Sequence, residues 1–86
     1  MSDDAVRKGQ KANQLANDEV FSAVLEKMRN DQYWAFESSK PEETAKREIA
    51  WSMLKAIENF RTEVTKMVDN GKVAQRAIDR ATKNIV

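Results

Sequence analysis

The feature that most constrains the fold is a long apolar seam in the second half of the chain. Its residues recur at alternating spacings of three and four: Ala50, Met53, Ile57, Phe60, Val64 and Met67. This spacing places the side chains on one face of an α-helix, and such a face packs against another helix at a shallow angle. The seam is therefore expected to need a long helical partner.

Residues that typically start or stop a helix set the expected bounds of the helix that carries this seam. Pro41 is tolerated at the first position of a helix, and the two acids that follow it favour the positive end of the helix dipole. Asn70-Gly71 is typical of a left-handed C-terminal stop. The long helix is thus predicted over about residues 41–69.

A shorter apolar stripe precedes Pro41. Asn17 or Asp18 can cap a helix whose apolar side chains share one face at 100° per residue. These side chains are Val20, Phe21, Val24, Leu25, Met28, Ala35 and Phe36. A helix over about 18–37, joined to the long helix by a proline turn, predicts an antiparallel helical hairpin that leaves part of the long seam uncovered.

Two helical arms are expected to flank the hairpin core of residues 18–69. Residues 1–17 carry a face of small residues that would let another helix approach closely: Ala5, Gly9, Ala12 and Ala16. Residues 72–86 read as a basic amphipathic helix that could fold back on the hairpin. With 86 residues, 2 Gly and 1 Pro, the chain is expected to form a single all-α domain over 1–86.

The composition argues against catalysis and metal binding. The chain has no His and no Cys, so its serines lack a histidine base and the Glu-x-x-His pairs of di-metal helical bundles are excluded. Two separated glycines are too few for a phosphate-binding loop. We expect no enzyme activity, no metal, no cofactor and no small-molecule substrate.

Charge and hydropathy narrow the expected partners. A net charge of +1 gives no bulk attraction to nucleic acid or to an anionic membrane. The N-terminus is acidic, and 18 apolar residues never occur in succession. No membrane partner is expected, and the cytoplasm is the expected compartment.

Two tryptophans point away from the apolar faces of their helices. Trp is common in binding hot spots because it removes a large area from water at little entropic cost. Trp34 and Trp51, together with Tyr33, are therefore candidate interface residues. Alternatively, an arm of the same chain could cover the tryptophans, or their side chains could simply be exposed to water.

Arg61 lies at the edge of the long seam, where its charged head has two possible environments. The head could reach water along its own stem, or it could pair with an acid of another helix and so set the register. Glu58, one turn earlier, is the local candidate for a partner.

Four cations share one face of the last segment at spacings of 4, 4 and 3. They are Lys72, Arg76, Arg80 and Lys83. Such a face could contact phosphates, dock on an acidic protein surface, or simply be solvated. No aromatic residue lies among them to stack on bases.

Three stretches of the chain together resemble a known group of proteins. They are KGQKANQLANDEVF over residues 8–21, Tyr33-Trp34, and residues 45–72 with Arg47, Trp51, Lys55, Arg61 and Gly71. In these stretches the chain resembles small helical proteins of unassigned function encoded near the head and portal genes of tailed bacteriophages and prophages. The resemblance implies a phage particle or its assembly as the context, and it carries over no catalytic residue.

The expected function is a non-enzymatic structural or assembly protein. It would bind itself as a homo-oligomer or larger protein subunits such as phage structural proteins, in the host cytoplasm or the virion. One alternative is a nucleic-acid-binding accessory protein or regulator that uses residues 72–86. Another is a small inhibitor of a host protein.

Overall fold

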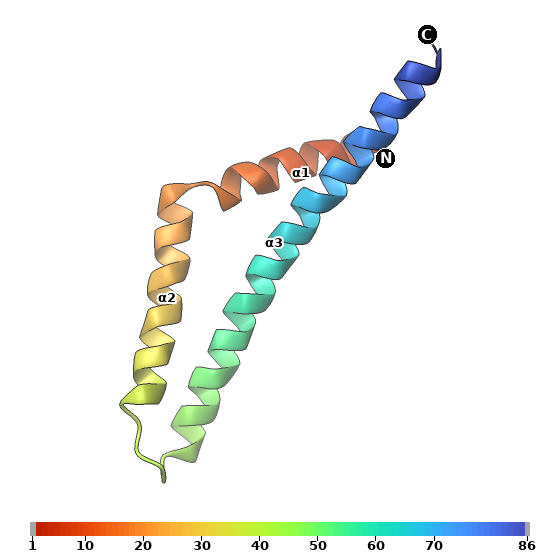
Figure 1. Cartoon of the computed structure of the whole chain (residues 1–86). Helices are drawn as coiled ribbons and strands as arrows, with labels where there is room; N and C mark the ends of the chain where they lie inside the picture. Colours follow the sequence, from red (N-terminus) through yellow and green to blue (C-terminus); the bar gives the residue numbers. More distant parts are fainter. Residues whose placement is uncertain (1, 86) are drawn as a thin grey trace. The chain divides into compact units, whose positions relative to one another are not determined.

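The computed structural model describes residues 2–85 and folds them into three α-helices (Figure 1). They are α1 (Ser2–Ala16), α2 (Glu19–Glu37) and α3 (Thr44–Ile85). No strand occurs among the described residues, so the predicted all-α class is confirmed. Met1 and Val86, the outermost residues of the expected arms, lie outside the described range.

The helix α3 is longer than the sequence indicated. It spans 42 residues, about 63 Å at 1.5 Å per residue, and passes through Asn70-Gly71 without interruption. Neither glycine has a positive φ. The predicted stop near residue 69 is therefore wrong, and residues 72–85 continue α3 instead of forming a separate helix that folds back. One glycine costs a helix about 1 kcal/mol relative to alanine, which the helix-forming residues on either side can offset.

The start of α3 also differs from the prediction, because Pro41 belongs to the turn that precedes the helix. The Glu43 N–H donates to the Lys40 carbonyl at 2.9 Å, which closes a four-residue turn with Pro41 in second place. Proline suits that place because its φ is already fixed near −65°. The Lys40 N–H donates to the Glu43 carboxylate at 2.9 Å, and α3 begins one residue later at Thr44.

The chain divides into two compact units, and each is described by itself. The hairpin unit is Glu19–Arg61 and contains α2 with the first part of α3. These two segments run antiparallel side by side (Figure 1), as predicted. Leu25, Ala50 and Ile57 are buried between them, and the Phe21 and Phe60 rings lie 5.9 Å apart at 44°.

The crossed-helix unit contains α1 and the part of α3 that follows Arg61. Gly9 and Ala12 of α1 and Gly71 of α3 are buried there. A Cβ built on Gly9 would lie 2.7 Å from the Gly71 Cα and 3.0 Å from the Met67 carbonyl oxygen. The small-residue face of α1 is thus used as predicted, and Gly71 serves close helix contact where a stop was expected.

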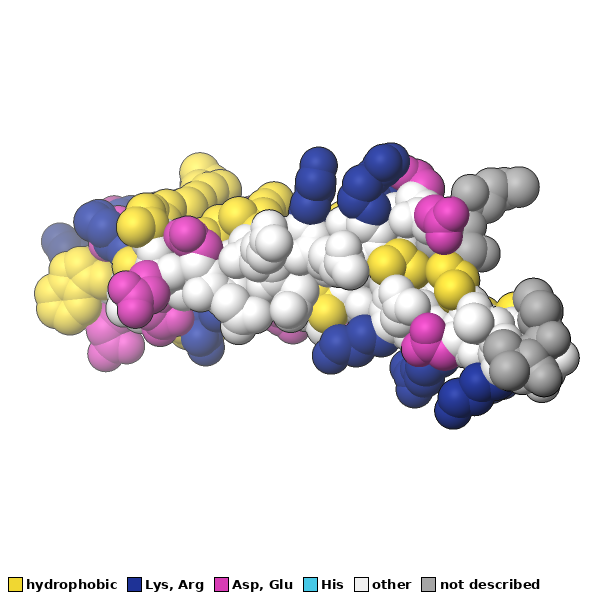
Figure 2. Space-filling model, turned by 90° about the horizontal axis from the view of Figure 1, so that it is seen from above, with side chains coloured by type: hydrophobic (Ala, Val, Ile, Leu, Met, Phe, Trp, Pro, Cys, Tyr) yellow, Lys and Arg dark blue, Asp and Glu magenta, His cyan; other side chains and the backbone are white. Residues whose placement is uncertain are grey.

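Both units have thin cores. Among the described side chains the buried hydrophobic ones are Ala12, Leu25, Ala50 and Ile57. Many larger apolar side chains remain partly exposed, and Figure 2 shows hydrophobic groups reaching the surface between charged ones. Each unit therefore presents more apolar surface than its own helices cover.

Candidate interaction surface

One face of the hairpin unit is an apolar groove of about 330 Å³. Eight side chains line it: Phe21, Val24, Leu25, Met28, Met53, Ala56, Ile57 and Phe60. None of the eight is polar. Val24 is 50% exposed and Phe60 48% exposed, whereas Leu25 and Ile57 are buried, so the groove has a buried floor and apolar rim side chains that are about half covered.

The groove forms because the apolar stripe on each helix is wider than the contact between the two helices. Leu25 and Ile57 lie at the centre of that contact and are buried. Val24 and Ala56 each precede a buried residue by one position and are rotated about 100° from it. Their side chains therefore turn to the same side of the hairpin, where no helix of this unit covers them.

The opposite face of the hairpin unit is polar. A hollow of about 260 Å³ there is lined by Arg29, Tyr33, Leu54, Ile57, Glu58 and Arg61. Glu26 of α2 has its Oε2 4.0 Å from the Nη1 of Arg61 and 4.0 Å from the Nη1 of Arg29. The pKa of Arg29 is raised, first by a hydrogen bond with Tyr33 and then by attraction to Tyr33 and Glu26.

Arg61 combines the two environments foreseen for it, because its side chain is 44% exposed and its guanidinium also approaches an acid. Its guanidinium pairs with Glu26, an acid of another helix, across the hairpin. Glu58, the local candidate, instead lies 3.5 Å from the Nζ of Lys55. Because the Arg61 and Glu26 side chains are about half exposed, the pair contributes little to stability, on the order of 0–1 kcal/mol.

The aromatic residues predicted at an interface line two hollows that share Phe36. Trp34 is 71% exposed and lines a shallow hollow with Tyr33. Trp51 is 57% exposed and lines a different hollow with Arg47, and the Nζ of Lys55 lies 5.6 Å from its ring. Neither tryptophan lines the apolar groove.

Arg47 and Phe36 form the tightest polar–aromatic contact near the turn. The guanidinium carbon lies 4.5 Å from the centre of the Phe36 ring. The Nε of Arg47 is buried and has no hydrogen-bond partner. This contact packs the end of α2 against the start of α3 and thereby has a structural role.

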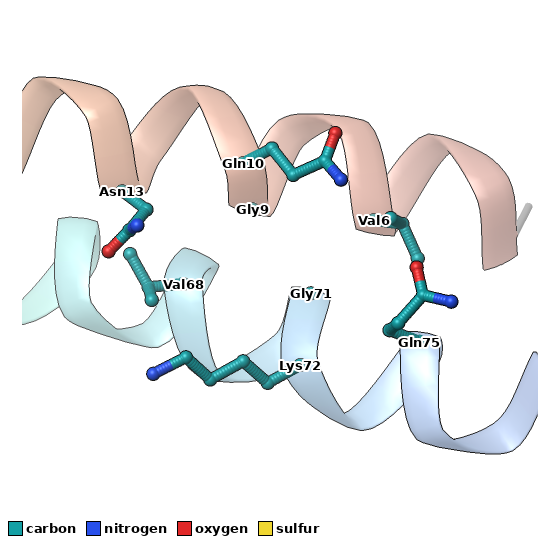
Figure 3. Close-up of a pocket in the computed structure, with 8 residues that line it drawn as sticks. All are labelled: Val6, Gly9, Gln10, Asn13, Val68, Gly71, Lys72 and Gln75. Atoms are coloured by element: carbon teal, nitrogen blue, oxygen red, sulfur yellow. The ribbon is translucent and has the colours of Figure 1, made fainter. Parts of the chain in front are cut away.

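The four cations predicted on the last segment remain on one exposed face of α3. Lys72 also borders a pocket of about 220 Å³ beside the helix crossing, with Gln10 and Asn13 of α1 (Figure 3). The Arg76 Nε donates to the Lys72 carbonyl at 3.3 Å. Arg76, Arg80 and Lys83 all lie on the solvent-exposed side, so this face can contact an anionic partner.

Over residues 2–85, no group of three or more His, Cys, Asp or Glu side chains could hold a metal ion. In the same range no helix is long and apolar enough to cross a membrane.

The apolar periodicity predicts that every groove residue except Ala56 lies on a packed face of its helix, and none of the eight is among the predicted interface residues. The width of the apolar stripes could have indicated the groove, because packing against one neighbouring helix buries a narrower stripe than α2 and α3 carry.

No protein-family model matches the chain, and no curated protein or solved structure matches it.

Proposed function

We propose that this protein is a non-enzymatic structural or assembly protein that acts through helix-mediated protein–protein contacts. The apolar groove of the hairpin unit is its contact surface. The observation that carries this proposal is the wholly apolar lining of a groove whose rim side chains, such as Val24 and Phe60, are about half exposed. Monomeric proteins rarely leave contiguous apolar surface of this kind in water, and it commonly marks an interaction site.

The energetics support the same conclusion. Each square ångström of apolar surface removed from water contributes about 25 cal/mol. Phe60, Met28 and Met53 can all still lose surface to a partner. Phe and Met are also enriched at the centres of interfaces. A helix laid in the groove would therefore gain most of its affinity there.

The context that we propose is a tailed-phage particle or its assembly, with larger virion subunits as partners. The support for this context is the resemblance carried by residues 8–21, 33–34 and 45–72. The proposal needs no catalytic residue, cofactor or metal.

In-cell photocross-linking tests the proposal. We place p-benzoylphenylalanine at Phe60 or Met53 in the groove, and at Tyr33 on the opposite face as a matched control, since Tyr33 is aromatic and similarly exposed. We expect protein cross-links from positions 60 and 53 in phage-producing cells and much weaker ones from 33. No cross-linked protein from either groove position would overturn the proposal.

A second candidate is nucleic-acid binding, and the exposed basic face of α3 favours it. If all four cations contact phosphates, affinity for duplex DNA should fall about 100-fold between 50 and 200 mM salt. Replacing Lys72, Arg76, Arg80 and Lys83 by Ala should abolish that binding. Fluorescence anisotropy measures both effects, and no binding at 50 mM salt would exclude this candidate.

A further inference from the structure

We infer that the occupant of the apolar groove is a second copy of this chain, so that two hairpin units pair about a two-fold axis into a four-helix bundle. This inference rests on the proposed function and names its partner. Four observations on the hairpin unit support it.

The first observation is the composition of the groove. All eight lining residues are apolar. Transient interfaces are about as polar as the rest of a protein surface, whereas permanent homodimer interfaces resemble a hydrophobic core cut in half. The groove thus has the character of a permanent interface.

The second observation is the small core. The hairpin unit buries only Leu25, Ala50 and Ile57. Two helices with so few buried side chains are marginal by themselves, and small domains commonly complete their cores by oligomerisation. A partner that completes the core must be available where the chain folds, and other copies of the chain are made in the same place and at the same time.

The third observation is the size of the face. The 19 residues of α2 extend about 28 Å, and two helices side by side are about 20 Å wide. The resulting footprint of about 600 Å² approaches the ~800 Å² that each partner buries in a stable protein–protein interface. A second hairpin unit presents a face of the same length and width.

The fourth observation is the charge at the edge of the groove. Asp31 follows Met28 by three positions and lies beside it on α2. Its carboxylate is 2.8 Å from the Nζ of Lys27. On α3 the edge positions beside Met53 and Phe60 are the uncharged Ser52 and Asn59 and the acidic Glu63, whose Oε1 lies 3.2 Å from the Nζ of Lys66. Two-fold pairing therefore brings no row of like charges together, which would oppose association.

Light scattering and sedimentation of the purified chain test this inference between about 1 and 200 µM. We expect a species of twice the 9.9 kDa chain mass. Val24→Asp and Met53→Asp each place a carboxylate in the groove and should weaken the dimer at least 100-fold, because burying an unpaired charge is costly. Tyr33→Asp, on the polar face, should leave the mass unchanged.

A second measurement does not depend on a disruptive variant. The chain has no cysteine, so a single nitroxide on Lys27→Cys reports only distances between different copies. We expect a defined distance distribution that disappears when labelled protein is diluted with an excess of unlabelled protein. A fully helical monomer at 200 µM, or a dimer that both groove variants leave intact, would overturn the inference.

The outcomes separate the inference from the function on which it rests. A monomer whose residue 60 cross-links to a different protein overturns the second copy and leaves the assembly function standing. Absence of every protein cross-link from the groove overturns both.

Discussion

Gly9 of α1 and Gly71 of α3 meet backbone to backbone. A Cβ on Gly71 would lie 2.8 Å from the Gly9 Cα and 3.2 Å from the Ala5 carbonyl oxygen, and the reverse substitution is equally crowded. Neither obstacle is a flexible side chain that could move aside. The two helices can therefore come this close at the crossing because neither glycine has a side chain.

Gly71→Ala tests the close helix crossing, because an exposed site and a crowded site predict opposite changes in stability. In an exposed helix this change would stabilise by about 1 kcal/mol. Here overpacking costs about 1–3 kcal/mol, so we expect a net loss and a lower melting temperature by circular dichroism. Asn70→Ala is the control, since Asn70 is an exposed neighbour and gains helix propensity without a clash. A melting temperature that rises in both variants would contradict the close crossing.

The buried and exposed isoleucines of α3 form a matched pair. Ile57 is 5% exposed and Ile49 is 64% exposed. Ile57→Ala should lower the free energy of unfolding by about 2–4 kcal/mol because it leaves a cavity between α2 and α3. Ile49→Ala should change it by under about 1 kcal/mol. Urea unfolding of both variants compares the two values, and equal losses would show that the hairpin is packed differently.

Acid should weaken the first turns of α1 through Asp4. Hydrogen bonds from Lys8 and then Arg7 hold the pKa of the Asp4 carboxyl below its ordinary value of 3.8. A pKa that is lower in the folded state stabilises the fold above the unfolded value, and this contribution is lost as pH falls through the folded value. We expect helicity in α1 to decline from about pH 4 downward.

The carboxyl ¹³C shift of Asp4 measures that pKa directly. Because the two ion pairs, 2.8 and 3.0 Å long, are exposed, salt at about 1 M should return the pKa toward 3.8. Asp4→Asn should remove the acid-dependent loss, and Asp3→Asn, which keeps both contacts, should retain it. An Asp4 pKa that salt leaves unchanged would argue against ion pairing as its cause.

The contact between Arg47 and Phe36 should be worth about 0.5–1 kcal/mol. Arg47→Met keeps the apolar stem and removes the charge that lies over the ring. A double-mutant cycle with Phe36→Leu isolates the coupling. Lys55→Met, whose ammonium lies farther from the more exposed Trp51, should show a smaller effect. Zero coupling between Arg47 and Phe36 would show that their contact does not stabilise the turn.

Periodicity predicted most of the architecture. The hairpin, its antiparallel sense and the α2 bounds follow from apolar stripes and from the break around Ser38–Pro41. Gly71 misled the prediction because a glycine can serve either a left-handed stop or a close crossing. The distinction depends on whether another helix lies opposite, and Gly9 is distant in sequence.

The interaction surface was harder to predict for a similar reason. Val24 and Phe60 look like core residues in sequence, and only the geometry of α2 against α3 shows that they are left half covered. Trp34 and Trp51 were correctly placed away from the seam, but sequence could not show that they border separate hollows. Angular position on one helix is readable from spacing, whereas adjacency between helices is not.

The scarcity of buried side chains has a consequence for how the protein behaves as its abundance changes. A folded state that association helps to complete is stabilised by mass action. At low concentration the helices would then be less stable and more readily cleaved by proteases. At high concentration they would be stable and resistant. The resistance of the protein to proteolysis would therefore rise with its concentration.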